Sequence, residues 1–186
     1  MDAQRTENGR ANALKRELEV RVEERCSASP EVVYDLLADL PSHLVWGGER
    51  QKKRKPRLIS IEAPESPATV GAEFSTLGTD VMGGFTDHSV VTESSRPGLF
   101  EFVTEAALTT KKGREAHWTN VHHYEITRDG DGSRIAYTVR IVRISSLPGM
   151  LAIFNVPGLS ALALRAAAAG ERRGVRNLAR MAEERG

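Results

Sequence analysis

Residues 157–186 read PGLSALALRAAAAGERRGVRNLARMAEERG and contain no proline after Pro157. Apolar residues in this stretch recur at three- to five-residue steps, the spacing that places side chains on one face of an α-helix. Arginines fall between them, which is typical of a solvated face. At 1.5 Å per residue, a helix over residues 158–184 is roughly 40 Å long and needs a large apolar surface to lie on. The predicted apolar face consists of Leu159, Leu162, Ala163, Ala166, Gly170, Val175, Leu178 and Met181.

The N-terminal third of the chain predicts one strand followed by two short helices. Residues 18–22 alternate apolar and charged side chains, which indicates a half-buried strand. Ser29 is a suitable helix cap, Pro30 suits the first helical position, and Glu31 favours the positive end of the helix dipole. Residues 42–46 predict a second helical turn that ends on an aromatic side chain.

The middle of the chain alternates extended segments with turn signals. The clearest turn is at residues 129–132, where Asp-Gly occurs twice in succession. Connections of hairpin length indicate an antiparallel sheet, and a long helix after such a sheet gives an α+β arrangement. With no internal repeat, we expect one domain over residues 17–186 after a flexible segment, 1–16. The predicted strands are 58–62, 69–76, 88–93, 99–105, 117–127 and 134–144.

The stretch SASPEVVYDLLADLP at residues 27–41, followed by Trp46, resembles the opening of the START/Bet v 1-like superfamily. More narrowly, it is similar to the bacterial polyketide cyclase/dehydrase-like branch of that superfamily. The hairpin at 129–135 and the terminal helix fit the same pattern. The resemblance implies a helix-grip fold, in which a seven-stranded curved antiparallel sheet surrounds the long C-terminal helix and two short helices follow strand 1. It also implies a cavity for an apolar ligand between sheet and helix.

The composition argues against several classes of protein. The 26 basic and 25 acidic side chains nearly cancel, so the chain has no overall bias toward nucleic acid or an anionic membrane. A single cysteine, Cys26, excludes an intrachain disulfide and fits a reducing compartment. No apolar run reaches the ~20 residues that a membrane span needs. The polar start of the chain lacks a signal-peptide core, so we expect a cytoplasmic protein.

The candidate ligand-binding residues follow from strand alternation, in which residues two apart share a face. Along residues 116–126, the even-numbered set ends in the more apolar pair, Tyr124 and Ile126, and is therefore assigned to the helix side. In an ordinary core, the same polar side chains would bond to one another and to water instead of to a ligand. The predicted lining is Trp46, Phe74, His88, Phe102, Trp118, Asn120, His122, Tyr124, Tyr137, Leu162 and Ala166.

Three classes of function remain open. The first is a protein that binds an apolar or aromatic small molecule, and the resemblance implies transport, sequestration or self-resistance in bacterial natural-product metabolism. The second is a cofactor-independent polyketide cyclase or aromatase that catalyses aldol cyclisation or dehydration. There His122 would be the base and Tyr124 or Tyr137 the donor to a carbonyl, with His88 as an alternative base. The third is a partner-binding module of the stress or toxin type.

No metal or other cofactor is expected. His122 and His123 are neighbours on a strand and point to opposite faces, and no cysteine pair accompanies them. A basic run could meet an anionic ligand, an acyl carrier protein or a phospholipid surface, or it could be a solvated loop. No aromatic residues interleave with it, which argues against nucleic acid. The run consists of Arg50, Lys52, Lys53, Arg54, Lys55 and Arg57.

Two glycines interrupt the predicted terminal helix. Gly170 and Gly174 each cost roughly 1 kcal/mol relative to alanine in a helix interior. They either make room for a ligand or for close approach of the sheet, or they are tolerated because packing holds the helix.

Overall fold

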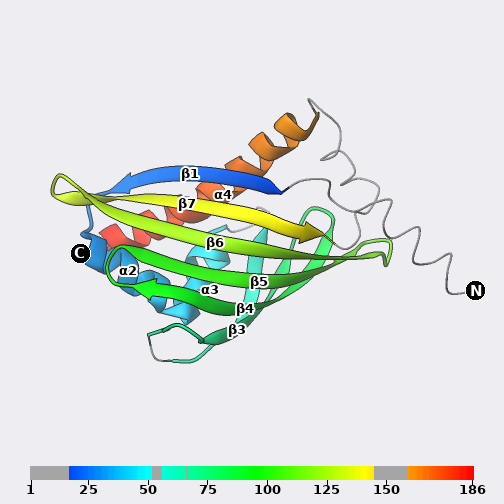
Figure 1. The fold of residues 1–186 in the computed structure, drawn as a ribbon, viewed down its shortest axis with the longest axis horizontal. Coiled ribbons are helices and arrows are strands. Elements are labelled where there is room, and N and C mark those ends of the chain that lie inside the picture. Colours follow the sequence, from blue (N-terminus) through cyan, green and yellow to red (C-terminus); the bar gives the residue numbers. More distant parts are fainter. Residues whose placement is uncertain (1–16, 52–55, 66, 145–158) are drawn as a thin grey trace, which may run out of the picture.

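The computed structural model describes residues 17–51, 56–65, 67–144 and 159–186. Short 3-10 turns at Leu40–Ser42 and Glu49–Gln51 flank the second of the small helices. The elements, labelled as in Figure 1, are β1 (Leu18–Cys26), α2 (Pro30–Ala38), α3 (His43–Gly47), β2 (Arg57–Glu62), β3 (Glu73–Thr79), β4 (Gly83–Ser95), β5 (Leu99–Thr110), β6 (Glu115–Asp129), β7 (Gly132–Ile144) and α4 (Leu159–Glu183).

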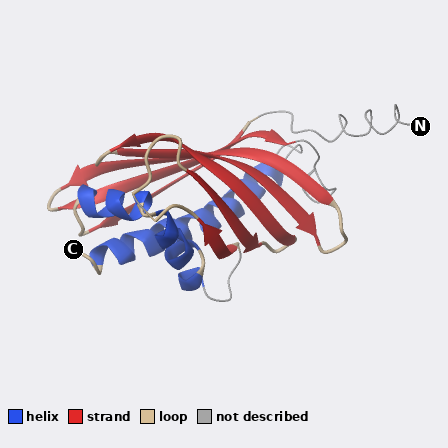
Figure 2. Cartoon of the chain, turned by 90° about the horizontal axis from the view of Figure 1, so that it is seen from below, coloured by secondary structure: helices blue, strands red, loops and turns tan. Residues whose placement is uncertain are grey.

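The strands form one seven-stranded antiparallel sheet in the order β1-β7-β6-β5-β4-β3-β2. Strands β2 to β7 follow one another as neighbours, and β1 adds to the free edge of β7. The sheet curves over the helices, which all lie on its concave side (Figure 2). This arrangement confirms the predicted α+β helix-grip fold.

The strands of the middle region are longer than predicted, because the glycine-rich stretch 78–84 is mostly strand. Only residues 80–82 turn, where the Asp80 carboxylate accepts the Met82 N–H at 2.8 Å. Gly78 stands opposite Phe85 on β4, and a side chain at Gly78 would collide with the Phe85 ring. The glycine therefore makes room for a cross-strand ring and does not mark a loop. The predicted strand 69–76 begins later, at Glu73.

Helix α2 begins at Pro30, as predicted from the start signals. The Ser29 side chain makes no capping hydrogen bond to the backbone, so the expected cap is wrong in detail. The helix is held by burial of Val33, Leu36 and Leu37, which are fully inaccessible. Tertiary packing outweighs the missing cap, as is usual for short helices.

Helix α4 lies against β1, α2 and α3, and its C-terminal half supplies much of the core. The predicted apolar face is wrong at Ala166, which is exposed. Ala166 lies nine residues before the buried Val175, and at ~100° per residue this places it on the opposite side of the helix. The side chain of Leu162 lies outside the described part of the chain. The buried residues of α4 are Val175, Leu178, Ala179, Met181 and Ala182.

A β-bulge in β7 changes which side chains face the helices. Asn120 on β6 pairs with Ile141, whereas the preceding Thr119 pairs with Arg143, so Val142 is the extra residue. Ile141 and Ile144 consequently both face inward although they are three positions apart, and both line the interior pocket described below. A strictly alternating strand would have turned Ile144 outward.

The packing of α4 predicts unequal effects of two leucine truncations. Leu178 is completely buried, so Leu178→Ala should lower the free energy of unfolding by about 3 kcal/mol. Leu164 borders a hollow, so Leu164→Ala should cost only about 1 kcal/mol, because fewer contacts are lost. Urea denaturation of both variants at one pH measures the difference. Equal losses would contradict a hollow beside Leu164.

Candidate functional site

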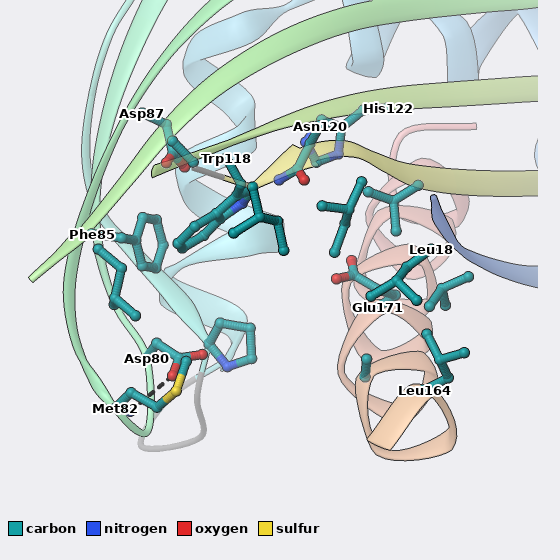
Figure 3. A pocket seen from close by; sticks show the side chains of 18 residues that line it. Leu18, Asp80, Met82, Phe85, Asp87, Trp118, Asn120, His122, Leu164 and Glu171 are labelled. Carbon is teal, nitrogen blue, oxygen red and sulfur yellow. Dashed lines mark hydrogen bonds between the residues drawn. The ribbon is translucent and has the colours of Figure 1, made fainter. Parts of the chain in front are cut away.

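A pocket of about 290 Å³ lies between the sheet and α4, and it is called the larger pocket below. Figure 3 shows Glu171 reaching into it from α4, with Trp118, Asn120 and His122 contributed by the sheet. Most of its wall is aliphatic or aromatic. The lining is Leu18, Val20, Pro56, Asp80, Met82, Phe85, Asp87, Ala106, Leu108, Trp118, Asn120, His122, Val139, Ile141, Ile144, Leu164, Ala167 and Glu171.

A second hollow of about 200 Å³, the smaller pocket, adjoins the first. The two share five lining residues, namely Pro56, Phe85, Asp87, His122 and Glu171. The smaller pocket continues toward α3. Its other lining residues include Trp46, Phe74, Phe102, Tyr124, Tyr137, Gly170 and Gly174.

Most of the residues predicted to line a cavity border one of these two pockets. Trp118 and Asn120 line the larger pocket, and His122 lines both pockets. The aromatic residues Trp46, Phe74, Phe102, Tyr124 and Tyr137 line the smaller pocket. These eight side chains come from four different strands and α3. Their contact with a ligand stays a prediction.

Two predicted residues lie elsewhere. His88 is exposed on the outer face of the sheet, where its Nδ1 lies 3.4 Å from the Ser75 hydroxyl. Its neighbours Asp87 and Ser89 take the inward positions of β4, so His88 is not available as a base in the cavity. Ala166 is exposed on the outer side of α4, for the geometric reason given above.

A chain of hydrogen bonds joins the sheet to α4 across the cavity. The His122 Nδ1 atom lies 2.7 Å from the Tyr137 hydroxyl, and that hydroxyl also interacts with the Glu171 carboxyl. The rings of Phe102 and His122 are stacked, with centroids 4.6 Å apart. The Tyr124 and Tyr137 rings are stacked at 4.5 Å. These ring contacts fix the positions of the polar groups.

Burial keeps His122, Tyr124 and Tyr137 uncharged. Desolvation lowers the pKa of His122 to about 3, and nearby His43 contributes to the shift. Desolvation and the nearby Glu171 carboxyl raise the pKa values of Tyr124 and Tyr137. An imidazole with so low a pKa is a poor general base near neutral pH. His122 is therefore suited to relaying or donating a hydrogen bond rather than to holding a proton.

Two carboxyl groups titrate close to neutrality. Burial raises the pKa of Glu171 to about 7, although its contact with Tyr137 and the charge of Arg173 oppose the shift. Burial also raises the pKa of Asp87 to about 7, opposed by a hydrogen bond from the Thr76 hydroxyl at 3.3 Å. A group with a pKa near the working pH can both accept and release a proton. Glu171, which also contacts the Tyr137 hydroxyl, is thus placed to act as an acid–base group in the cavity.

The α3 wall of the smaller pocket carries a second histidine. The His43 Nε2–H donates to the Leu37 carbonyl oxygen at 2.8 Å, and burial lowers the His43 pKa to about 4. The His43 ring lies 4.7 Å from the Trp46 ring. Trp46 is only 8% exposed, and its indole N–H has no acceptor among the described residues. This buried, unpaired donor is available to a ligand.

Sequence reasoning missed Glu171 and Asp87. Glu171 lies four residues before the buried Val175, a spacing that keeps both on one face of a helix. That spacing is a usable signal, although a charged side chain beside the arginines of this stretch is typical of a solvated face. Asp87 shares the inward side of β4 with Phe85 and Ser89, and its orientation depends on a strand boundary that the sequence did not place.

The two helix glycines line the smaller pocket. A β-carbon built at Gly174 would lie 3.9 Å from the Gln51 Nε2 and 4.0 Å from the Trp46 ring, and one at Gly170 would lie 3.6 Å from Pro56. These are ordinary contact distances. The missing side chains therefore widen the pocket, and close approach of the sheet does not require them.

Other predicted features lie outside the cavity or outside the described residues. His123 faces the opposite side of the sheet from His122, and its Nδ1 lies 2.8 Å from a Glu101 carboxylate oxygen. Within the described ranges, no three His, Cys, Asp or Glu side chains are grouped so as to hold a metal ion. Residues 52–55 of the basic run are not described, and Arg50 pairs with Glu184 on the C-terminal segment.

The chain is similar in fold to several solved structures, many of them of bacterial proteins. An uncharacterized protein from Rhizobium leguminosarum matches with a TM-score of 0.64 and 11% identity, covering 94% of this chain and 99% of that one. TTHA0849 from Thermus thermophilus matches with a TM-score of 0.59 and 14% identity, covering 89% of this chain and 97% of that one. Ara h 8.0201, a Bet v 1-like structure, matches with a TM-score of 0.53 and 10% identity, covering 90% of this chain and 98% of that one.

These likenesses establish the Bet v 1-like helix-grip fold, and at such low identity they establish the fold alone. No family model matches the sequence. No curated protein matches it either. In the described part of the chain, no helix is both long and apolar enough to cross a membrane.

The raised pKa of Glu171 predicts how stability changes with pH. Between pH 4.5 and 7 the folded protein keeps a proton that the unfolded chain has lost, so this group makes stability fall as pH rises and level off above pH 7. Asp87 acts in the same direction, whereas the lowered pKa values of His43 and His122 act in the opposite one. The dependence of the wild-type free energy of unfolding on pH therefore combines opposing contributions from these four groups.

Comparison with Glu171→Gln isolates the carboxyl. The free energy of unfolding of the variant minus that of the wild type should increase from pH 4.5 to pH 7.5 by an amount on the order of 3 kcal/mol. Urea denaturation at several pH values measures this difference. A difference independent of pH would show that Glu171 titrates normally.

Proposed function

We propose that the protein binds an apolar or aromatic small molecule between the sheet and α4. The observation that carries this proposal is the pair of adjoining pockets, which have apolar walls and a few placed polar groups. Such a combination is typical of small-molecule sites, in which polar groups orient a ligand held mainly by apolar contact. The buried Trp46 N–H without an acceptor among the described residues supports the same conclusion, because an unpaired buried donor is unfavourable without a partner.

The biological setting we propose is bacterial natural-product metabolism, with transport, sequestration or self-resistance as the role. This part rests on the resemblance of residues 27–41 to the polyketide cyclase/dehydrase-like branch and on the fold shared with bacterial proteins. Docking of an acyl carrier protein on the basic run 50–57 belongs to the same setting and rests on the charge of that run alone.

A pair of alanines on β5 provides the test of binding. Ala106 faces the larger pocket and Ala107 faces the outer side of the sheet. Ala106→Leu should weaken binding of the neutral fluorescent probe N-phenyl-1-naphthylamine by at least about tenfold, since the added carbons occupy the pocket. Ala107→Leu is the matched control and should bind as the wild type does. The readout is the fluorescence increase on titration, with thermal unfolding to verify that both variants fold.

Unchanged probe affinity in Ala106→Leu would contradict the proposal, because the probe would then bind elsewhere. Absence of probe binding to the wild-type protein would contradict it equally.

A second candidate function is acid–base catalysis on a polyketide-like substrate. The Glu171–Tyr137–His122 chain favours it, since it places a carboxyl that titrates near pH 7 beside a phenol inside an apolar cavity. In this scheme Glu171 replaces His122 as the base that removes a proton next to a carbonyl. The Tyr137 hydroxyl or the His122 imidazole would donate a hydrogen bond to the developing oxyanion.

The enzyme and the binder are distinguished by one variant. If the protein is a cyclase, Glu171→Gln should lower turnover of a short linear polyketide thioester by at least about a hundredfold, the usual contribution of a general base. Binding of the neutral naphthyl probe should persist in that variant. Absence of turnover by the wild-type protein would leave the binding function and exclude the enzyme for this substrate class.

A further inference from the structure

The ionisable side chains that line the larger pocket are mostly acidic. They are three carboxyl groups, on Asp80, Asp87 and Glu171, and the neutral imidazole of His122. Among the described residues, no lysine or arginine lines this pocket. A pocket whose described lining carries carboxyl groups and no lysine or arginine is unfavourable for anionic ligands and favourable for cationic ones.

The unsatisfied polar atoms of this pocket's residues are all acceptors. Asp87 Oδ1 and Asn120 Oδ1 are buried and receive no hydrogen bond from the described residues. Both belong to side chains whose terminal torsion is broad, so a modest rotation presents either oxygen to a ligand. A ligand with several N–H donors would satisfy both atoms, whereas a ligand carrying only acceptors would satisfy neither.

The arginines of α4 largely face away from the cavity. Arg176 donates to Glu24 on β1 at 3.0 Å, and Arg172 lies 4.0 Å from the same carboxylate. Arg173 is the cation of this helix that influences Glu171. The smaller pocket shares Asp87, Glu171 and His122 with the larger one. Its other charged or titratable lining residues are Tyr124 and Tyr137 from the sheet, His43 from α3 and Arg57 from β2.

We infer that the bound molecule carries an amine, cationic at neutral pH, whose nitrogen lies in the larger pocket and donates hydrogen bonds to Glu171, Asp87 or Asn120. The Glu171 carboxyl points into the pocket from α4, with Asp87 and Asn120 on the sheet side (Figure 3). The apolar part of the ligand then extends beside Trp118 and Phe85. This inference rests on the proposed binding function and specifies its ligand class.

The test uses three naphthalenes that differ only in their polar group. 2-Naphthylmethylamine, 2-naphthylmethanol and 2-naphthoate are each titrated calorimetrically into the full chain at pH 8. The amine should bind about tenfold tighter than the alcohol or better, since a hydrogen bond between charged partners exceeds a neutral one, and the alcohol should bind tighter than the carboxylate.

A pH comparison adds an independent readout. The amine is charged at pH 5 and at pH 8, whereas Glu171 and Asp87 release their protons between these values. Affinity for the amine should therefore rise from pH 5 to pH 8, and affinity for the alcohol should change little.

Two variants and a control locate the effect. Glu171→Gln and Asp87→Asn keep the side-chain shape, and each should lower the preference for the amine over the alcohol at pH 8 by severalfold or more. Glu19→Gln removes a carboxylate from the exposed side of β1 and should leave all three affinities unchanged.

The two proposals fail in different ways. Equal affinity for amine, alcohol and carboxylate, with Ala106→Leu still weakening binding, overturns the amine inference and leaves the binding function intact. Tighter binding of the carboxylate overturns the inference in the same way. Unchanged affinity of Ala106→Leu for all three naphthalenes overturns the binding function itself, because the ligands would then lie outside the pocket.

Discussion

One face of α4 meets two environments along its length, and the rest of the structure depends on this division. In the C-terminal half, Val175 and Leu178 pack against β1, α2 and α3 and are excluded from water. In the N-terminal half, Leu164, Ala167 and Glu171 continue the same face but border the larger pocket. The buried cluster therefore surrounds the C-terminal half of the helix, and the larger pocket lies between the sheet and its N-terminal half. The packed C-terminal half holds the helix in place. The side chains of the N-terminal half are therefore not needed for packing and can contact a ligand.

Inside the cavity, the positions of protons are linked through three side chains. Tyr137 has one hydroxyl proton and lies between Glu171 and His122. When Glu171 is ionised, Tyr137 donates to it and the His122 Nδ1–H donates to the Tyr137 oxygen. When Glu171 is protonated, it can donate to Tyr137, and the Tyr137 proton can then go to His122 Nδ1 or to the Tyr124 hydroxyl. Where Tyr137 donates to His122 Nδ1, the His122 Nε2 atom carries the ring proton and is a donor, so the charge of Glu171 is coupled to the hydrogen-bonding role of His122.

Binding and catalysis would use the same groups here, and they differ only in what the ligand presents to Glu171. A cationic amine stabilises the ionised carboxylate and lowers its pKa, which makes the site a binder of charged molecules. A ligand with an acidic C–H next to a carbonyl would instead meet a carboxylate that desolvation has made more basic. The apolar walls serve both cases, because they exclude water and strengthen each electrostatic contact.

Local sequence patterns were enough to predict an antiparallel sheet followed by a long helix and the inward face of β6, and the resemblance of residues 27–41 implied the helix-grip architecture. Strand alternation places Trp118, Asn120, His122 and Tyr124 together whatever the rest of the fold does, because a pleated strand sends every second side chain to one face. Three features could not be predicted in this way, namely the bulge that turns Ile144 inward, the outward direction of His88 and the burial of Glu171. They depend on register between distant strands and on the rotation of α4 about its axis. Both are set by packing across the whole domain rather than by local periodicity.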